Sequence, residues 1–190
     1  MKINRQGKSR TLDTEQLDLI TSYLPSNKHK LISLLLRKSA ARISEIVSLR
    51  YQDLTPTTIL IPKQVVKGKL RPREIPISKS TFEQIINFKA SCIERGEDTS
   101  SDSFIFKGRN NKTSLTTRAF QKVLSKAVER ASLIGFSSHG YRRSSLSAGS
   151  DAGVPIRHLA EISGHQSMAV LQGYLTVKRE HLESAVDTFA

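Results

Sequence analysis

The stretch that decides the fold runs from His139 to Tyr174 and reads HGYRRSSLSAGSDAGVPIRHLAEISGHQSMAVLQGY. We expect helical segments in it that are interrupted at Gly153 and Gly164, because glycine readily ends a helix. Arginine grips phosphate oxygens with a planar fork, histidine moves protons near neutral pH, and a tyrosine hydroxyl can form a covalent ester. The stretch therefore indicates phosphate chemistry, carried by His139, Arg142, His165 and Tyr174.

The whole chain is strongly basic. Its 190 residues include 30 Lys and Arg against 17 Asp and Glu, a formal net charge of +13. This length suggests one domain, with room for a short arm. Such a surplus of positive charge favours a polyanionic partner, DNA or RNA. A solvated basic surface or a ribosome-associated protein would explain the charge alone equally well.

The cysteine count and the hydropathy exclude several classes of protein. Cys92 is the single cysteine, so an intramolecular disulfide and a cysteine-rich zinc site are both excluded. No apolar run approaches the roughly 20 residues of a membrane span, and the N-terminus does not resemble a signal peptide. We therefore expect a cytoplasmic protein without a membrane partner, associated with the nucleoid if it is bacterial.

The N-terminal third is expected to be an arm followed by helices. Residues 1–10 are polar and basic without an apolar period, which predicts a flexible arm, and the folded domain is then 11–190. Asp13 and Gln16 have the spacing of a capping box at a helix start. Residues 42–54 read RISEIVSLRYQDL, an apolar helical stripe that begins with an arginine. Alone, that arginine would cap the helix or pair with an acid.

The middle of the chain contains three short runs rich in β-branched and apolar residues, 57–61, 65–66 and 74–77. The last two flank a basic turn with a glycine, and the runs together predict a small antiparallel sheet with a hairpin. Basic residues in such a turn also protect a sheet edge from aggregation, so they need not bind a ligand. The candidates for phosphate contact in and beside this turn are Lys67, Lys69, Arg71 and Arg73.

Two further helices are predicted between the hairpin and the C-terminal stretch. The first, at about 79–95, should turn Phe82, Ile85, Ile86 and Cys92 inward. The second should begin after Thr116, a typical N-cap residue. Its outer face has basic residues four apart, which suits phosphate contacts as well as it suits a solvated surface: Arg118, Lys122, Lys126 and Arg130.

The motifs together resemble the signature of the tyrosine recombinases, also called the phage integrase family. That pattern has His-x-x-Arg, then Gly-His, then a nucleophilic tyrosine nine residues later. Its second arginine motif, Arg-x-Ser-Glu-Leu-x-x-Leu, is similar to RISEIVSL, and its hairpin lysine precedes a glycine as Lys67 does. The resemblance covers about residues 10–180. It implies a mainly α fold with a small antiparallel β-sheet (α+β).

The resemblance also implies a role for each matching residue. Tyr174 would attack a DNA phosphate and form a 3′-phosphotyrosine, with His139 as its base. The phosphate would be held by Arg42, Arg142 and His165. Lys67, or Lys69 by an alternative count along the hairpin, would protonate the departing 5′-oxygen. Two arginines and a lysine replace metal ions in such a scheme, so no metal, ATP or other cofactor is expected.

Two departures from the family pattern stand out. Arg143 occupies a position where many relatives have a second histidine, and we assign it no chemical role. The family pattern also begins near the start of the sequence, at about residue 10, and the N-terminal domain of many relatives does not precede it. The chain therefore resembles short members such as the fimbrial phase-switch recombinases, or else a fragment of a longer enzyme.

The sequence thus predicts a site-specific DNA recombinase that acts on double-stranded DNA as a homo-oligomer, a tetramer in this family. An amphipathic segment at 178–189 suits exchange of a C-terminal helix between subunits, or folding onto its own domain. A type IB topoisomerase shares the chemistry and is the alternative enzyme. A DNA-binding regulator that has lost turnover is the alternative without catalysis.

Overall fold

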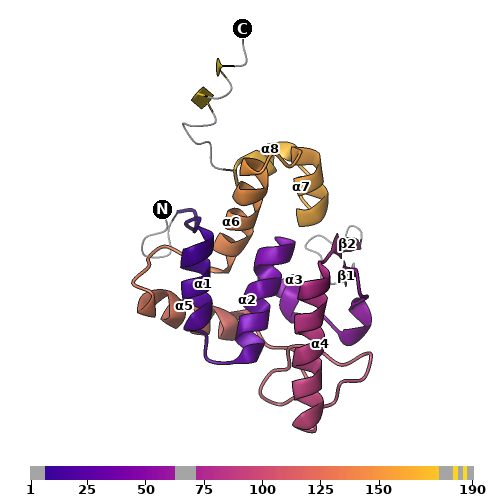
Figure 1. Ribbon diagram of the computed structural model, residues 1–190. Coiled ribbons are helices and arrows are strands. Elements are labelled where there is room, and N and C mark those ends of the chain that lie inside the picture. Colours follow the sequence, from indigo (N-terminus) through magenta and orange to yellow (C-terminus); the bar gives the residue numbers. More distant parts are fainter. Residues whose placement is uncertain (1–6, 63–71, 176–181, 184–185, 188–190) are drawn as a thin grey trace.

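The computed structural model describes residues 7–62, 72–175, 182–183 and 186–187 (Figure 1). This part of the chain is mainly helical with one two-stranded antiparallel sheet, so the predicted fold class is confirmed. None of its helices combines the length and the hydropathy that crossing a bilayer requires. In chain order the elements are α1 (Thr14–Ser22), α2 (Asn27–Ser39), α3 (Ile43–Val47), the 3-10 turn η1 (Tyr51–Asp53), β1 (Thr58–Ile61), β2 (Arg73–Pro76), α4 (Lys79–Glu94), α5 (Thr117–Arg130), α6 (Ser138–Asp151), α7 (Ile156–Ser163) and α8 (Met168–Gln172).

The helix starts follow the capping residues of the sequence. The Asp13 carboxylate accepts a hydrogen bond from the Gln16 amide at 2.8 Å, and the Gln16 side chain accepts one from the Asp13 amide. The Thr116 hydroxyl caps α5 by accepting from the Ala119 amide at 3.1 Å. These side chains satisfy backbone donors that a helix leaves unpaired at its start. Both predicted starts are therefore confirmed.

Helix α2 forms the centre of the main core, between α1 and α4 in Figure 1. Ile32, Leu35 and Leu36 on this helix are fully buried. Helix α6 packs across it, and the buried Tyr141 of α6 accepts a hydrogen bond from the Ser33 hydroxyl at 2.9 Å. This contact satisfies two polar groups inside the core and fixes α6, which carries two predicted site residues, against α2.

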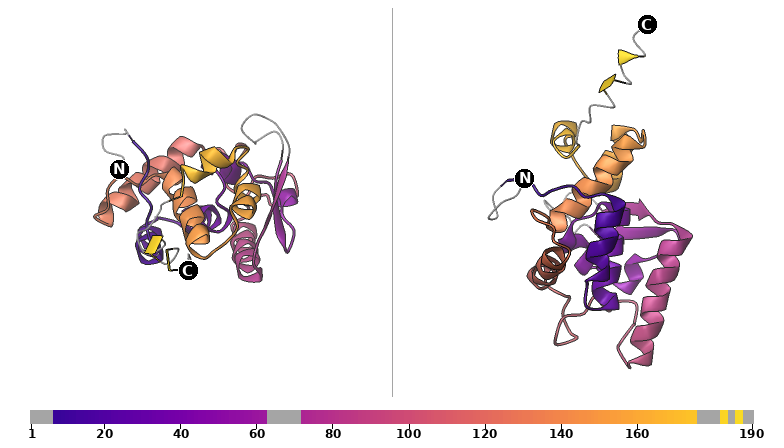
Figure 2. Two further views of the ribbon diagram at one scale, coloured as in Figure 1. Left: turned by 90° about the horizontal axis from the view of Figure 1, so that it is seen from above. Right: turned by 60° about the vertical axis from the view of Figure 1, so that its left-hand side comes forward.

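A second, smaller apolar cluster joins α6, α7 and α8 at one end of the molecule (Figures 1 and 2). Leu146, Leu159 and Leu171 are its buried members from these three helices, and Ala40 adds the C-terminal end of α2. Tyr174 is partly buried against the same cluster. The cluster therefore holds the predicted nucleophile beside the end of α2.

The hairpin lies next to α7. Its register pairs Ile59 with Ile75, and both side chains are buried. The turn between the strands, 63–71, lies outside the described residues, and with it the predicted site residues Lys67, Lys69 and Arg71. Most of the predicted C-terminal segment 178–189 lies outside them as well.

Residues 7–10, the described part of the expected arm, lie along the start of α6. The buried Ser9 hydroxyl accepts a hydrogen bond from the Ser137 amide at 3.1 Å. The Arg10 amide donates to the Gly135 carbonyl at 2.8 Å. The Leu12 amide donates to the Ser144 hydroxyl at 2.9 Å. These backbone contacts require no apolar pattern, which is why the sequence did not indicate them.

Helix α4 departs from its predicted inward face at one residue. Ile85 is fully buried as expected, but Ile86 is 42% exposed. Consecutive residues of a helix point about a third of a turn apart, so both cannot face the same narrow core. The inward face instead continues from Ile85 to Phe88 and Cys92.

Candidate active site

The junction between α2 and α3 forms one wall of the site. Helix α2 ends at Ala40, whose left-handed backbone (φ 49°) turns the chain sharply before Arg42. This turn presents the Ala40 carbonyl to α6, where it accepts a hydrogen bond from Nη1 of Arg142 at 2.7 Å. A single turn thus positions Arg42 and supplies an anchor for Arg142.

Arg142 is the most deeply buried cation of the site, with an exposure of 1%. Its hydrogen-bond partners, the Ala40 carbonyl and the His165 ring, carry no negative charge, and its Nε is buried without a partner in the described chain. Burial, together with the charge of Arg42, lowers the pKa of Arg142 to about 10, so the side chain is still a cation at neutral pH. A buried cation with neutral partners is costly, and an anionic ligand would compensate it.

Glu45 is a buried carboxylate shared by two arginines. Its Oε1 lies 3.0 Å from Nη1 of Arg42, and its Oε2 lies 2.9 Å from Nη2 of Arg73. The Arg42 backbone amide also donates to Oε2 at 2.7 Å. Burial alone would raise the pKa of Glu45, but the hydrogen bonds and charges of Arg73 and Arg42 outweigh it and lower the pKa. Two cations share one anion, so the cluster keeps a positive charge.

His165 follows Gly164, which ends α7 in the left-handed conformation (φ 68°). The Ser163 hydroxyl donates to the Leu159 carbonyl at 2.6 Å, so its oxygen is left to accept from Nδ1 of His165 at 2.7 Å. This places the imidazole proton on Nδ1 and the lone pair on Nε2. Burial, followed by the charge of Arg142, lowers the pKa of His165 to about 4. The ring is therefore neutral at pH 7.

Tyr174 completes the site from the segment after α8. Its ring centroid lies 4.8 Å from that of His165, in an edge-to-face arrangement. The guanidinium carbon of Arg142 lies 5.8 Å from the same centroid. Nη2 of Arg142 in turn lies 3.1 Å from each ring nitrogen of His165. Residues from α6, the α7–α8 loop and the segment after α8 thus converge on one point.

His139 lies on the same helix as Arg142 but belongs to a neighbouring groove. It lines a groove between α5 and α6, together with the exposed Arg118, Lys122 and Lys126 of the predicted basic stripe. The structure thus brings these three cations and His139 together. They form a basic surface between α5 and the start of α6, a charge distribution that favours a nucleic-acid backbone.

Arg73 has surroundings that the sequence did not indicate. We expected it to be a phosphate contact on the hairpin, whereas the structure pairs it with Glu45 and leaves its side chain 9% exposed. The Arg42 side chain on the same carboxylate is 24% exposed. The sequence indicated that Arg42 could pair with a nearby acid, which is Glu45, but the 28-residue separation between Glu45 and Arg73 leaves no local signal.

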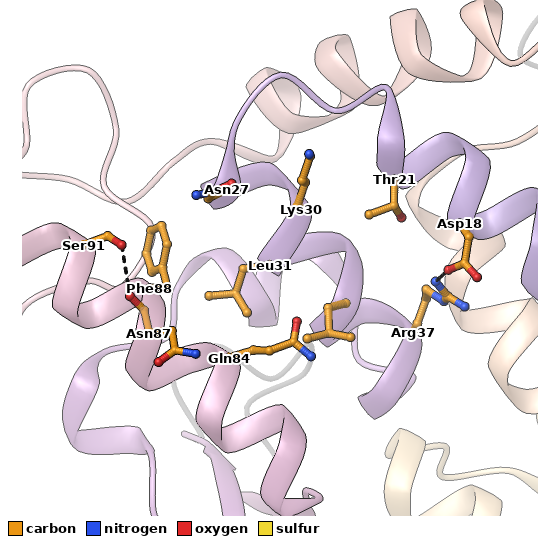
Figure 3. A pocket seen from close by; sticks show the side chains of 11 residues that line it. Asp18, Thr21, Asn27, Lys30, Leu31, Arg37, Gln84, Asn87, Phe88 and Ser91 are labelled. Atoms are coloured by element: carbon orange, nitrogen blue, oxygen red, sulfur yellow. Dashed lines mark hydrogen bonds and ion pairs between the residues drawn. The ribbon is translucent and has the colours of Figure 1, made fainter.

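A groove between α2 and α4 has a different character (Figure 3). Arg37 at its edge is paired with Asp18, as the dashed line in Figure 3 marks. Most of its other lining side chains are neutral, among them Asn27, Gln84 and Asn87. Its residues do not combine a nucleophile with buried cations, so the convergence around Tyr174 is the stronger candidate for chemistry.

Comparison with known proteins identifies the family of the chain. The model of the phage integrase family matches residues 10–181. The chain belongs to the phage integrase family, whose members are tyrosine recombinases. Among curated proteins, it is 28% identical over 180 residues to tyrosine recombinase XerA of Pyrococcus furiosus, covering 94% of this chain and 61% of the relative. It is 31% identical over 151 residues to tyrosine recombinase XerC of Oceanobacillus iheyensis, covering 76% and 47%.

Solved structures give the same fold. The crystal structure of XerA recombinase superposes with a TM-score of 0.77 at 15% identity, over 96% of this chain and 64% of that one. The catalytic domain of bacteriophage HP1 integrase superposes with a TM-score of 0.66 at 19% identity, over 96% of both chains. The chain thus has the fold of a tyrosine recombinase catalytic domain, and it spans about three fifths of the length of the XerA relatives.

Proposed function

We propose that the chain is the catalytic domain of a site-specific DNA recombinase that cleaves and rejoins strands through a 3′-phosphotyrosine. The observation that carries the proposal is a set of unpaired donors around Tyr174. In the described chain, the buried side-chain nitrogens that lack a hydrogen-bond partner include Nε of Arg142 and Nε of Arg73. Guanidinium groups that retain unused donors in a buried site favour a phosphate as the ligand.

The chemistry assigned to the site conserves one phosphodiester bond. The Tyr174 oxygen attacks phosphorus and forms a new ester, while the bond from phosphorus to the 5′-oxygen breaks. The tyrosine proton passes to His139, and the departing 5′-oxygen takes a proton from Lys67, or from Lys69 by the alternative count. No nucleotide is consumed, because the bond energy is held in the phosphotyrosine. Arg42 and Arg142 stabilise the additional negative charge of the transition state.

His165 has a defined part in this scheme. Its Nε2 carries the lone pair while Nδ1 donates to Ser163, so the neutral ring has no proton to offer a phosphate through Nε2. A phosphate brings negative charge next to the ring and raises its pKa. Protonation at Nε2 then supplies a donor to a non-bridging oxygen. DNA binding should therefore be coupled to proton uptake at this residue.

Double-stranded DNA is the partner that the basic surface and the relatives favour. XerH recombinase, which has a TM-score of 0.75 to this chain at 20% identity, was solved bound to its difH substrate. The groove cations Arg118, Lys122 and Lys126 are the proposed backbone contacts, joined by Lys69 and Arg71 of the hairpin turn. Assembly into a homotetramer on DNA and action in the cytoplasm complete the proposal.

One experiment identifies the target DNA and tests for the covalent intermediate. Purified chain is incubated with fragmented genomic DNA of its source organism, denatured and captured, and the covalently attached DNA is sequenced. We expect one sharp set of sequences that is absent with Tyr174→Phe, which should still retain DNA under native conditions. Scattered covalent DNA, with relaxation of any supercoiled plasmid, would instead indicate a topoisomerase. DNA recovered only under native conditions would indicate a binding protein without turnover.

A further inference from the structure

Arg143 contacts the residue immediately before the proposed nucleophile. Its Nη1 donates a hydrogen bond to the Gly173 carbonyl at 3.1 Å. Its guanidinium carbon also lies 5.8 Å from the centroid of the Tyr174 ring. One side chain thus contacts both the backbone and the ring of the segment that has to deliver a tyrosine oxygen to phosphorus.

The segment that carries Tyr174 has little support from its own helix. Helix α8 spans five residues, Met168–Gln172, and a helix this short is not stable by itself. Val170 on it is 57% exposed, whereas Leu171 is fully buried. A carbonyl at the end of a helix has no partner within the helix and favours a cation. Arg143 supplies that cation to Gly173 from outside α8.

A second cation reaches the same carbonyl from the N-terminal segment. Nζ of Lys8 lies 3.3 Å from the Gly173 oxygen. Lys8 lies next to Ser9, which is bound to Ser137 at the start of α6. The Gly173 carbonyl is therefore held from two sides, by α6 itself and by the segment that runs along α6.

Helix α6 thus carries two consecutive arginines with different contacts. Arg142 reaches the Ala40 carbonyl and faces His165, whereas Arg143 reaches Gly173. Because both belong to one rigid helix, the group that binds phosphate and the group that anchors the tyrosine segment keep a fixed separation. Fixed geometry between nucleophile and phosphorus lowers the entropic part of the barrier.

We propose that Arg143 is a positioning residue for Tyr174, and that it holds the tyrosine segment in register with the phosphate-binding arginine of the same helix. The inference rests on the proposed function for the role of the nucleophile. The contact itself does not depend on that function. Substitution of Arg143 should displace the tyrosine and slow formation of the phosphotyrosine, and it should leave DNA affinity unchanged.

The position of Tyr174 can be measured without DNA. The chain contains four tyrosines, and incorporation of 3-fluorotyrosine gives one ¹⁹F resonance for each. Tyr174→Phe assigns the resonance of Tyr174. Arg143→Gln should shift that resonance and leave those of the three tyrosines outside the segment in place. Arg143→Lys, which keeps a donor and a charge, should restore the shift in part.

Single-turnover cleavage of the recovered target DNA gives the second readout. At saturating DNA, Arg143→Gln should slow covalent-complex formation by about tenfold to a hundredfold, as a small misplacement of a reacting group does. Its Kd for DNA should stay within about twofold of the wild-type value. If the other tyrosine resonances also move in this variant, Arg143→Met, which keeps the aliphatic stem, replaces it.

The outcomes separate this inference from the proposed function. An unmoved Tyr174 resonance, or a wild-type cleavage rate in both Arg143→Gln and Arg143→Met, overturns the positioning role. A loss that disappears at saturating DNA also overturns it, because Arg143 would then be a DNA contact. A shifted resonance in a chain whose wild type forms no covalent DNA supports the positioning contact and overturns the recombinase proposal instead.

Discussion

The guanidinium of Arg73 forms a two-point ion pair with the carboxylate of Glu45, with 2.9 Å between Nη2 and Oε2 and 3.4 Å between Nη1 and Oε1. Arg73 begins strand β2, immediately after the hairpin turn that contains Lys67. Glu45 lies in α3 and holds Arg42 through its other contacts. The pair therefore connects the hairpin that carries the proposed general acid to an arginine that would bind the phosphate.

Glu45→Gln should destabilise the chain markedly. The substitution leaves Arg73 and Arg42 without their shared anion, and breaking a buried ion pair costs about 3–5 kcal/mol. Urea denaturation of the two proteins measures the difference. Glu83→Gln is the matched control, because Glu83 lies 3.9 Å from Lys79 on the exposed face of α4 and should change nothing measurable. Equal stabilities of the two variants would contradict the role assigned to Glu45.

Gly164→Ala should disturb the site more than a glycine substitution of similar backbone strain. A Cβ at residue 164 would lie 2.3 Å from Nη1 of Arg73, which Glu45 holds in place. Gly153→Ala is the control, because Gly153 has a similar positive φ of 77° and nothing within 4 Å of its added Cβ. We expect Gly164→Ala to be less stable than Gly153→Ala by about 1–3 kcal/mol, the usual cost of overpacking. Thermal unfolding of both proteins tests this difference.

His165 should make the stability of the chain depend on pH in a defined direction. Its pKa falls from the ordinary 6.5 to about 4 in the folded protein, so the unfolded chain binds more protons between these values. This contribution to stability is complete above about pH 6.5 and is lost as the pH falls towards 4. His165→Gln should flatten the acid side of the stability curve, measured by urea unfolding from pH 7 to pH 4.

The control for His165→Gln is the same substitution at the exposed His158, measured over the same pH range. Burial and the charge of Lys28 also lower the pKa of His29. That contribution has the same direction and remains in both variants, so it does not affect the comparison. A curve for His165→Gln that is as steep as that of His158→Gln would contradict the assignment.

Arg142→Lys should abolish cleavage although it keeps the charge. The guanidinium donates to the Ala40 carbonyl through Nη1 and places Nη2 next to His165. The single ammonium group of a lysine cannot occupy both positions at once. We expect covalent-complex formation to fall by at least about a hundredfold, as for loss of a donor to a developing anion. Arg157→Lys on the exposed face of α7 is the control. Cleavage close to the wild-type rate would remove Arg142 from the proposed chemistry.

Much of the site could be predicted because its spacing is local. His165 follows a glycine that ends a helix, and Tyr174 lies nine residues further on, so short-range helix rules bring both to one end of the molecule. The helix caps at Asp13 and Thr116 could be predicted for the same reason, since each cap is a contact with the residue three positions later. The family resemblance added the chemistry that is proposed for this arrangement.

The rest depends on contacts between residues far apart in the chain. The pair of Arg73 with Glu45, and the contacts of Lys8 and Arg143 with Gly173, are each set by how elements pack rather than by a local pattern. The same reason explains the N-terminal segment, where Ser9 binds Ser137 across 128 positions of sequence. A flexible polar arm and a polar segment that binds along a helix have the same composition, so composition cannot distinguish them.

The shared carboxylate of Glu45 has a consequence for protein engineering. Arg42 and Glu45 belong to the start of α3, Arg73 to β2 and Gly164 to the end of α7, so residues from three separate segments restrict one another's substitution. A chimera that receives its hairpin from another recombinase should therefore keep the geometry of the site only if the new hairpin has an arginine at position 73. If the proposed recombinase is to be retargeted, libraries should keep these four positions together and vary the α5 groove instead.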